Sequence, residues 1–175
     1  IENKIVPEEN LKIEYINNIL KSLEGKQEQI PPMYSAIKVN GKKLYEYARK
    51  GEKLEIKPRQ IEIYDIELLK LDRINKQIEF EVACSKGTYI RTLCENIAEK
   101  LGTVGYMKEL KRTQVGEFKI ENAITIEELE KKQSCITIES YFKQNKKINL
   151  DEKKLQLFLN GVQLTWNLED GIYRI

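Results

Sequence analysis

The sequence predicts an α+β fold in which helices flank a mixed, largely antiparallel sheet. Apolar and polar residues alternate over residues 61–68 and 78–84, as in strands that bury one face. Apolar residues recur every three or four positions over residues 16–23 and 90–101, as in helices that pack on a core. With 175 residues, 41% hydrophobic and 33% charged, the chain has the balance of one globular domain, or of one domain with an appendage.

The first predicted element is an amphipathic helix that begins near Pro7 and ends at Gly25. Proline followed by Glu8 and Glu9 suits a first helical turn. The apolar face of this helix comprises Ile16, Ile19, Leu20 and Leu23. The pair Pro31-Pro32 cannot continue a helix, so a new segment starts there.

A tight turn, a short helix and a hairpin are predicted next. Asn40-Gly41 marks the turn, and Gly51 stops a helix that begins at Leu44. The two alternating stretches form a hairpin that turns near Asn75. Their alternation shifts by one residue after Ile63, which indicates either a bulge or an irregular strand end.

The second half of the chain alternates helices with strands. A glycine turn at residues 85–89 leads into a helix over Ile90–Leu101, which Gly102 ends. The later elements are a strand over 110–118, a helix from the Thr125–Glu128 capping box to about Lys132, a short helix with Leu155 and Leu159, and a strand at 172–175.

Residue usage excludes several kinds of chemistry. The chain has no histidine, which removes histidine-based catalysis and most zinc chemistry. Cys84, Cys94 and Cys135 form no C-x-x-C pair, so neither a disulfide framework nor a zinc knuckle is indicated. No apolar run approaches the ~20 residues of a membrane span, and no signal-like leader is present, so we expect a cytoplasmic protein.

Positive charge is concentrated in two segments although the net charge is only +2. Residues 30–60 carry eight basic and three acidic residues, and residues 85–112 carry six and three. Local positive charge is what phosphate binding requires, so this distribution favours a polyanion partner. On charge alone, an ordinary solvated surface is an equally good interpretation.

Three strings carry residues suited to chemistry or to nucleic-acid binding. They read PPMYSAIKVNGKKLYEYARKG at 31–51, CSKGTYIRTL at 84–93 and KELKRTQVG at 108–116. Aromatic residues interleaved with cations suit RNA, because rings stack on bases while cations meet phosphates. In their order and spacing the three strings resemble the bacterial tRNA pseudouridine-55 synthases. The resemblance is strong over residues 26–129.

This resemblance implies part of the pseudouridine synthase fold and a cofactor-free, metal-free isomerase that flips the T-arm uridine of tRNA out of its loop. By the resemblance, Arg91 holds a nucleophilic aspartate in orientation, Tyr89 stacks beneath the uracil, and Leu110 packs on its other side. It also implies a thumb insertion at about residues 30–58 that closes over the T-arm. Candidate RNA-binding residues are Tyr34, Lys38, Lys42, Lys43 and Arg49 on the thumb, and Lys86, Lys108, Lys111 and Arg112 on an opposite wall. The implied partner is tRNA, with neither a membrane nor an obligate protein partner.

The chain departs from that family in one respect. The family's nucleophile lies in a Gly-x-Leu-Asp-Pro-type string ahead of the thumb, and no such string occurs here. We therefore expect a piece of the synthase that is inactive alone, with residues 1–133 from the catalytic domain and 134–175 a linker and incomplete PUA-like region. The alternative is a non-catalytic module for structured RNA, such as a tRNA chaperone. A guide-RNA-dependent relative fits less well, because its thumb matches less closely.

Overall fold

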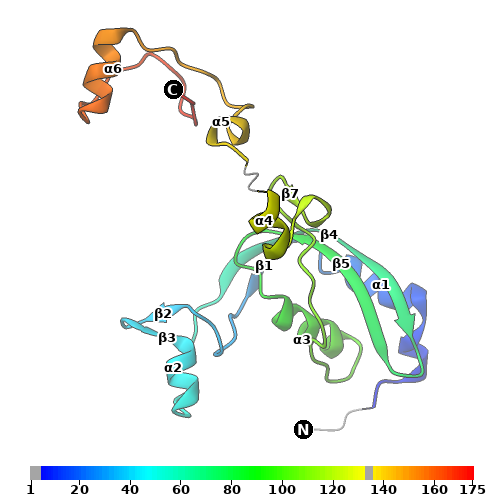
Figure 1. The fold of residues 1–175 in the computed structure, drawn as a ribbon. Coiled ribbons are helices and arrows are strands. Elements are labelled where there is room, and N and C mark those ends of the chain that lie inside the picture. The colour runs from blue at the N-terminus through cyan, green and yellow to red at the C-terminus, as the bar shows by residue number, and fades with distance from the viewer. Residues whose placement is uncertain (1–4, 133–135) are drawn as a thin grey trace. The chain divides into compact units, whose positions relative to one another are not determined.

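The computed structural model describes residues 5–132 and 136–175 and divides into two compact units, Ile1–Lys111 and Arg112–Ile175 (Figure 1). The domain boundary expected after residue 133 lies outside the described residues, and the division at that point stays a prediction. None of the helices in the described ranges has the length and apolar character needed to cross a membrane.

An antiparallel sheet with the order β1-β4-β5 forms the centre of the first unit. Its strands are β1 Gly25–Gln29, β4 Arg59–Asp72 and β5 Gln77–Cys84. The predicted hairpin is therefore confirmed, and its turn is fastened by Asp72, whose carboxylate accepts hydrogen bonds from Asn75. The pairing shifts between Ile63 and Asp65, so the predicted irregularity is real.

Two helices, α1 Ile13–Lys21 and α3 Ile90–Lys100, contribute to the same hydrophobic cluster as β4. Because the register of β4 shifts between Ile63 and Asp65, Ile63 and Ile66 both face that cluster although they are three positions apart, and each is 1% exposed. The remaining buried members are Val6, Ile16, Ile19, Leu20, Leu23, Leu93, Ile97 and Leu101. Burying each large aliphatic side chain contributes roughly 1.5–3 kcal/mol, so this cluster is the main source of stability in the unit.

The predicted amphipathic helix is confirmed as α1, with Ile16, Ile19 and Leu20 buried, but its predicted extent from Pro7 to Gly25 is wrong. A 3-10 helix, Glu8–Leu11, precedes α1, and Lys12 between them is extended, with φ −91° and ψ 137°. Tertiary contacts explain the break: Val6 is buried in the core, and the Asn10 side chain donates a 2.9 Å hydrogen bond to the carbonyl of Leu101. Local periodicity does not record such contacts.

Strand β1 was not predicted, because its sequence GKQEQ has no apolar residue to reveal the alternation. It lies at the edge of the sheet and pairs with β4 in register, from Gly25 opposite Ile63 to Gln29 opposite Arg59. Backbone pairing alone thus makes a strand of a polar segment. The segment 30–58 leaves the sheet after Gln29 and returns at Arg59.

That segment, where the thumb was expected, is called the thumb below; it contains the short hairpin β2 Lys38–Val39 with β3 Lys42–Lys43, followed by α2 Leu44–Arg49. The predicted turn is confirmed, because Asn40 and Gly41 have φ 51° and 81°, as a two-residue hairpin turn requires. Gly51, at φ 73°, follows the helix as expected.

The second unit consists of short elements: β6 Gln114–Val115, β7 Phe118–Lys119, a 3-10 helix Ile120–Asn122, α4 Ile126–Lys132, α5 Ile138–Tyr141 and α6 Glu152–Leu159. The predicted capping box is confirmed. Thr125 Oγ1 accepts a hydrogen bond from the amide of Glu128, and the Glu128 carboxylate accepts one from the amide of Thr125. Helix α6 is also confirmed, whereas α5 was not predicted.

Two strand predictions in this part of the chain are wrong. The strand expected over 110–118 is a hairpin of β6 with β7, because Gly116, at φ 57°, turns the chain back. The strand expected at 172–175 is reduced to one bridge, in which Arg174 pairs with Lys147. Despite these two differences, the predicted α+β class and the antiparallel sheet are confirmed.

Candidate functional site

The turn between β5 and α3 is fixed at its first residue by strand β4. The amide of Ser85 donates to the carbonyl of Glu62 at 2.8 Å, and the Ser85 hydroxyl accepts from the amide of Glu62 at 2.9 Å. The Thr88 hydroxyl then donates to the Ser85 carbonyl, and Gly87 supplies the positive φ of 89° that the turn needs. Helix α3 therefore begins at a position set by the sheet.

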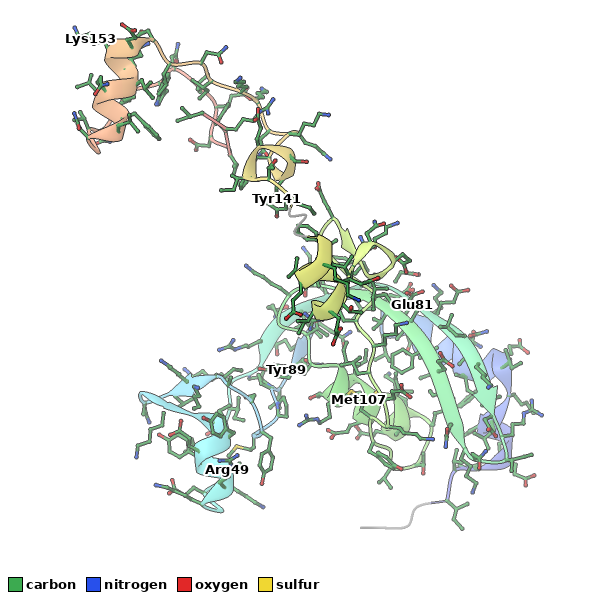
Figure 2. All side chains as sticks on the ribbon, in the orientation of Figure 1. Arg49, Glu81, Tyr89, Met107, Tyr141 and Lys153 are labelled. Atoms are coloured by element: carbon green, nitrogen blue, oxygen red, sulfur yellow. The ribbon has the colours of Figure 1, made fainter. Side chains whose placement is uncertain are left out.

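Tyr89 and Arg91 lie at the start of α3, as the sequence predicted. Tyr89 is the half-buried N-cap residue, and in Figure 2 its label lies between α3 and the segment that leads to α2. Arg91 is exposed in the first helical turn. Within the described ranges, no carboxylate forms an ion pair with Arg91. Its guanidinium thus keeps its five donors available for a planar anionic group.

The thumb presents four of its predicted RNA-binding residues to solvent, namely Tyr34, Lys38, Lys42 and Arg49, and Lys43 is half-buried. The Lys43 ammonium lies 5.5 Å and the Arg49 guanidinium carbon 5.3 Å from the centre of the Tyr45 ring. Both distances are those of cation–π contacts. Tyr45 therefore gathers two of the predicted phosphate-binding cations around one ring.

Contacts within the thumb link its helix to its hairpin. Leu44 is fully buried, and its amide donates to the carbonyl of Ile37 at 2.8 Å. The Tyr47 hydroxyl donates to the carbonyl of Val39 at 3.2 Å and so ties α2 to the β2–β3 hairpin. The cations on this hairpin and helix consequently sit on a small ordered scaffold instead of a free loop.

The residues expected on the opposite wall are divided between the two units. Lys86 is exposed in the turn before α3, and Lys108 donates a 3.2 Å hydrogen bond to the side-chain oxygen of Gln77 at the start of β5. Leu110, which is 53% exposed, and Lys111 lie outside helices and strands, whereas Arg112 is the first residue of the second unit. Of the predicted site residues, Lys86, Tyr89 and Arg91 therefore lie together, in the turn before α3 and at the start of that helix.

Few cations in the described ranges are neutralised by carboxylates. Ion pairs there involve only Lys21, with Glu24 and Asp65, and Arg174, with Glu139. The predicted RNA-binding lysines and arginines on the thumb and around α3 take part in none of them. Their charge is therefore available to an external polyanion.

Two residues at this site were missed from the sequence. Tyr45 lies four positions before Arg49 on α2, a spacing that places both side chains on one helical face and could have revealed the pair. Gln29 bonds to the backbone of Tyr89, sixty positions away. No local pattern signals that second contact.

Comparisons with known proteins agree on one family. The model of the TruB family pseudouridylate synthase N-terminal domain matches residues 1–90, and that of the tRNA pseudouridylate synthase B C-terminal domain matches residues 91–156. A tRNA pseudouridine synthase B from Caldanaerobacter subterraneus is 41% identical over 93% of the chain, and one from Clostridium tetani is 44% identical over 93%. The chain spans 58% of the length of each of these relatives.

Among solved structures, a chain in the crystal structure of a Cbf5-Nop10-Gar1 complex is similar in fold. The TM-score is 0.55 with 30% sequence identity, and the match covers 81% of the present chain and 34% of the other.

Proposed function

The chain belongs to the TruB family of pseudouridylate synthases, and we propose that the full-length protein containing it isomerises the T-arm uridine of tRNA, position 55, to pseudouridine. Relatives named tRNA pseudouridine synthase B support the substrate class. The three strings that led to the T-arm synthases support the particular uridine.

The observation that carries the proposal is the exposed Arg91, without a carboxylate partner in the described ranges and two positions from the half-buried Tyr89. Arginine can pair with a carboxylate through two parallel hydrogen bonds and so fix its direction. We assign Arg91 to orient an aspartate nucleophile that lies outside these 175 residues. The four aspartates present do not stand in the family's string, and their positions are 65, 72, 151 and 170.

The reaction requires the target uridine to leave its stack, because the nucleophile cannot reach it there. We assign Tyr89 to stack beneath the flipped uracil and Leu110, 53% exposed, to cover the other side and exclude water. The aspartate attacks the nucleotide, the bond from sugar to base nitrogen breaks, the base rotates, and a bond from the sugar to a ring carbon forms. The bond to the aspartate breaks, the ring carbon loses its proton and the freed ring nitrogen takes one up, so the product is an isomer of the substrate and no external reactant is consumed.

We assign RNA binding to two groups of cations, one on the thumb and one in the segments before and after α3. On the thumb, Tyr45 gathers Lys43 and Arg49, and Lys38 and Lys42 lie exposed on the adjoining hairpin. In the second group, Lys86, Lys108, Lys111 and Arg112 are exposed. Exposed cations of this kind bind phosphates without reading sequence.

Arginine replacement in the full-length protein tests the chemistry. We expect Arg91→Ala to lower kcat for pseudouridine formation by about 10²- to 10³-fold, as loss of one group that stabilises charge does, while the Kd for tRNA changes by about threefold or less. Arg91→Lys keeps the positive charge but cannot form two parallel hydrogen bonds to a carboxylate, so it should recover little activity. Lys100→Ala, at the other end of α3, is the matched control and should leave kcat unchanged.

The second candidate is an RNA-binding module without catalysis, which the unpaired cations also support. Full-length protein that binds tRNA tightly but forms no carbon-linked pseudouridine would select this candidate. We expect the isolated 175-residue chain to bind tRNA weakly and to form no pseudouridine, because it lacks the aspartate string.

A further inference from the structure

The Gln29 side chain makes two hydrogen bonds to the backbone of one residue, Tyr89. Its oxygen accepts from the Tyr89 amide at 2.8 Å, and its nitrogen donates to the Tyr89 carbonyl at 3.1 Å. Gln29 is 5% exposed, so these bonds are shielded from water. Both functional groups of the amide are used, which no hydrophobic residue could reproduce.

These bonds fix the residue from which α3 starts. The Tyr89 side chain makes no capping hydrogen bond, and its backbone is extended, with φ −95° and ψ 105°. Its amide points out of the helix to Gln29, while its carbonyl accepts both from Gln29 and from the amide of Leu93. With both peptide groups held, the direction of the Tyr89 side chain from its backbone is set.

Gln29 also ends β1, opposite Arg59 at the start of β4. The thumb leaves the sheet after Gln29 and returns at Arg59. One buried amide therefore links the base of the thumb to the residue that begins α3.

We propose that Gln29 is a positioning residue for the isomerisation: it holds the backbone of Tyr89 so that the ring lies flat beneath the flipped uracil. This inference rests on the function proposed above for Tyr89. Stacking requires a ring plane placed to within a fraction of an ångström, and misplacement of about 1 Å can lower a rate by about 100-fold.

The test compares Gln29→Met with Gln27→Met in the full-length protein. Gln27 is a matched control, because it lies two positions earlier on β1 and its side chain donates one bond, to the carbonyl of Leu23. We expect Gln29→Met to slow single-turnover pseudouridine formation by about 10- to 100-fold, with the Kd for tRNA nearly unchanged. Gln27→Met should leave the rate near that of the wild type.

Two further measurements separate positioning from general stability. Hydrogen exchange at the Tyr89 amide should become about tenfold faster in Gln29→Met, the equivalent of one lost hydrogen bond. In a Tyr89→Leu background, Gln29→Met should slow the reaction little further, because the ring that it positions is gone. A full additional loss there, or an equal loss in Gln27→Met, would overturn the inference.

If Gln29→Met does not fold, Gln29→Glu carries the same test. An ionised carboxylate accepts from the Tyr89 amide but cannot donate to its carbonyl, whereas a protonated carboxyl does both. The rate deficit should therefore shrink as pH falls, relative to the wild type, and a deficit independent of pH would count against positioning. A wild-type protein that makes no pseudouridine would instead refute the proposed function itself.

Discussion

Tyr89 and Arg91 stand two positions apart but have opposite surroundings. Tyr89 is half-buried and has both backbone groups bonded to Gln29, whereas Arg91 is exposed and unpaired in the described ranges. The string CSKGTYIRTL predicted that both residues would stand at the start of a helix. It could not predict their environments, because the contacts of Tyr89 come from Gln29 on β1, sixty positions away.

Cys94, on α3, gives a prediction about pH. Burial, and next the neighbouring carboxylate of Glu95, raise the pKa of the Cys94 thiol above its usual value. In a Cys84→Ser/Cys135→Ser background, Cys94 should react with iodoacetamide more slowly than a free cysteine at pH 8 and at the normal rate in denaturant. Labelling that is equally fast in the native protein would contradict this.

The same raised pKa affects stability. Because the folded-state pKa exceeds the unfolded value, the contribution is complete below the unfolded pKa, near 8.5, and is lost as pH rises through the folded pKa. As pH rises, the free energy of unfolding should therefore fall more steeply in the Cys84→Ser/Cys135→Ser protein than in the same protein with Cys94→Ala added.

At the scale of elements, the thumb is a hairpin and a short helix fastened by Tyr47 and Leu44. The Asn40-Gly41 turn and the Gly51 stop were predictable, because a positive φ is a local requirement. The grouping of Lys43 and Arg49 around Tyr45 arises only when α2 follows β3 without a break.

Thumb lysines should control the salt dependence of tRNA binding. Replacing Lys42 and Lys43 with alanine in the full-length protein should weaken binding and reduce the slope of log K against log salt by about one unit for each lost phosphate contact. The control is Lys26→Ala/Lys70→Ala, which removes the same charge from exposed positions of the sheet. An identical slope for the wild type and the thumb variant would remove these lysines from the RNA interface.

Close packing of the segment after α3 gives a prediction about Gly105. A Cβ atom there would lie 2.7 Å from the Cβ of Ala98, which is 7% exposed on α3. Gly105→Ala should lower the free energy of unfolding by about 1–3 kcal/mol, as overpacking does. Adding Ala98→Gly should restore part of the loss, and Gly171→Ala, which meets only ordinary contacts, should be neutral in urea unfolding.

At the scale of the whole chain, burial differs sharply between the two units. The first has a continuous core from α1, β4 and α3, whereas no described residue of the second is buried. Phe118 and Tyr141 do stack, with ring centres 5.4 Å apart. One ring pair contributes about 0.5–1.5 kcal/mol beyond its burial, far less than a core.

Hydrogen exchange of the 175-residue chain should follow this difference. We expect slow amide exchange in α1, β4 and α3 and fast exchange in α6, because local opening of α6 exposes little apolar surface. Mass spectrometry of peptic peptides measures both. Equal protection of α6 and α3 would require a core in the second unit that the described residues do not contain.

The sequence by itself determined the α+β class, the hairpin with its irregularity, the glycine and asparagine turns, and the strings that identify the family. These features are local, because periodicity, positive φ and capping involve neighbours within a few positions. Tertiary structure alone decided the break at Lys12, the strand β1 and the bond from Gln29 to Tyr89. Each depends on backbone or side-chain pairing between residues 30 or more positions apart, and such pairing leaves no pattern in the segment that undergoes it.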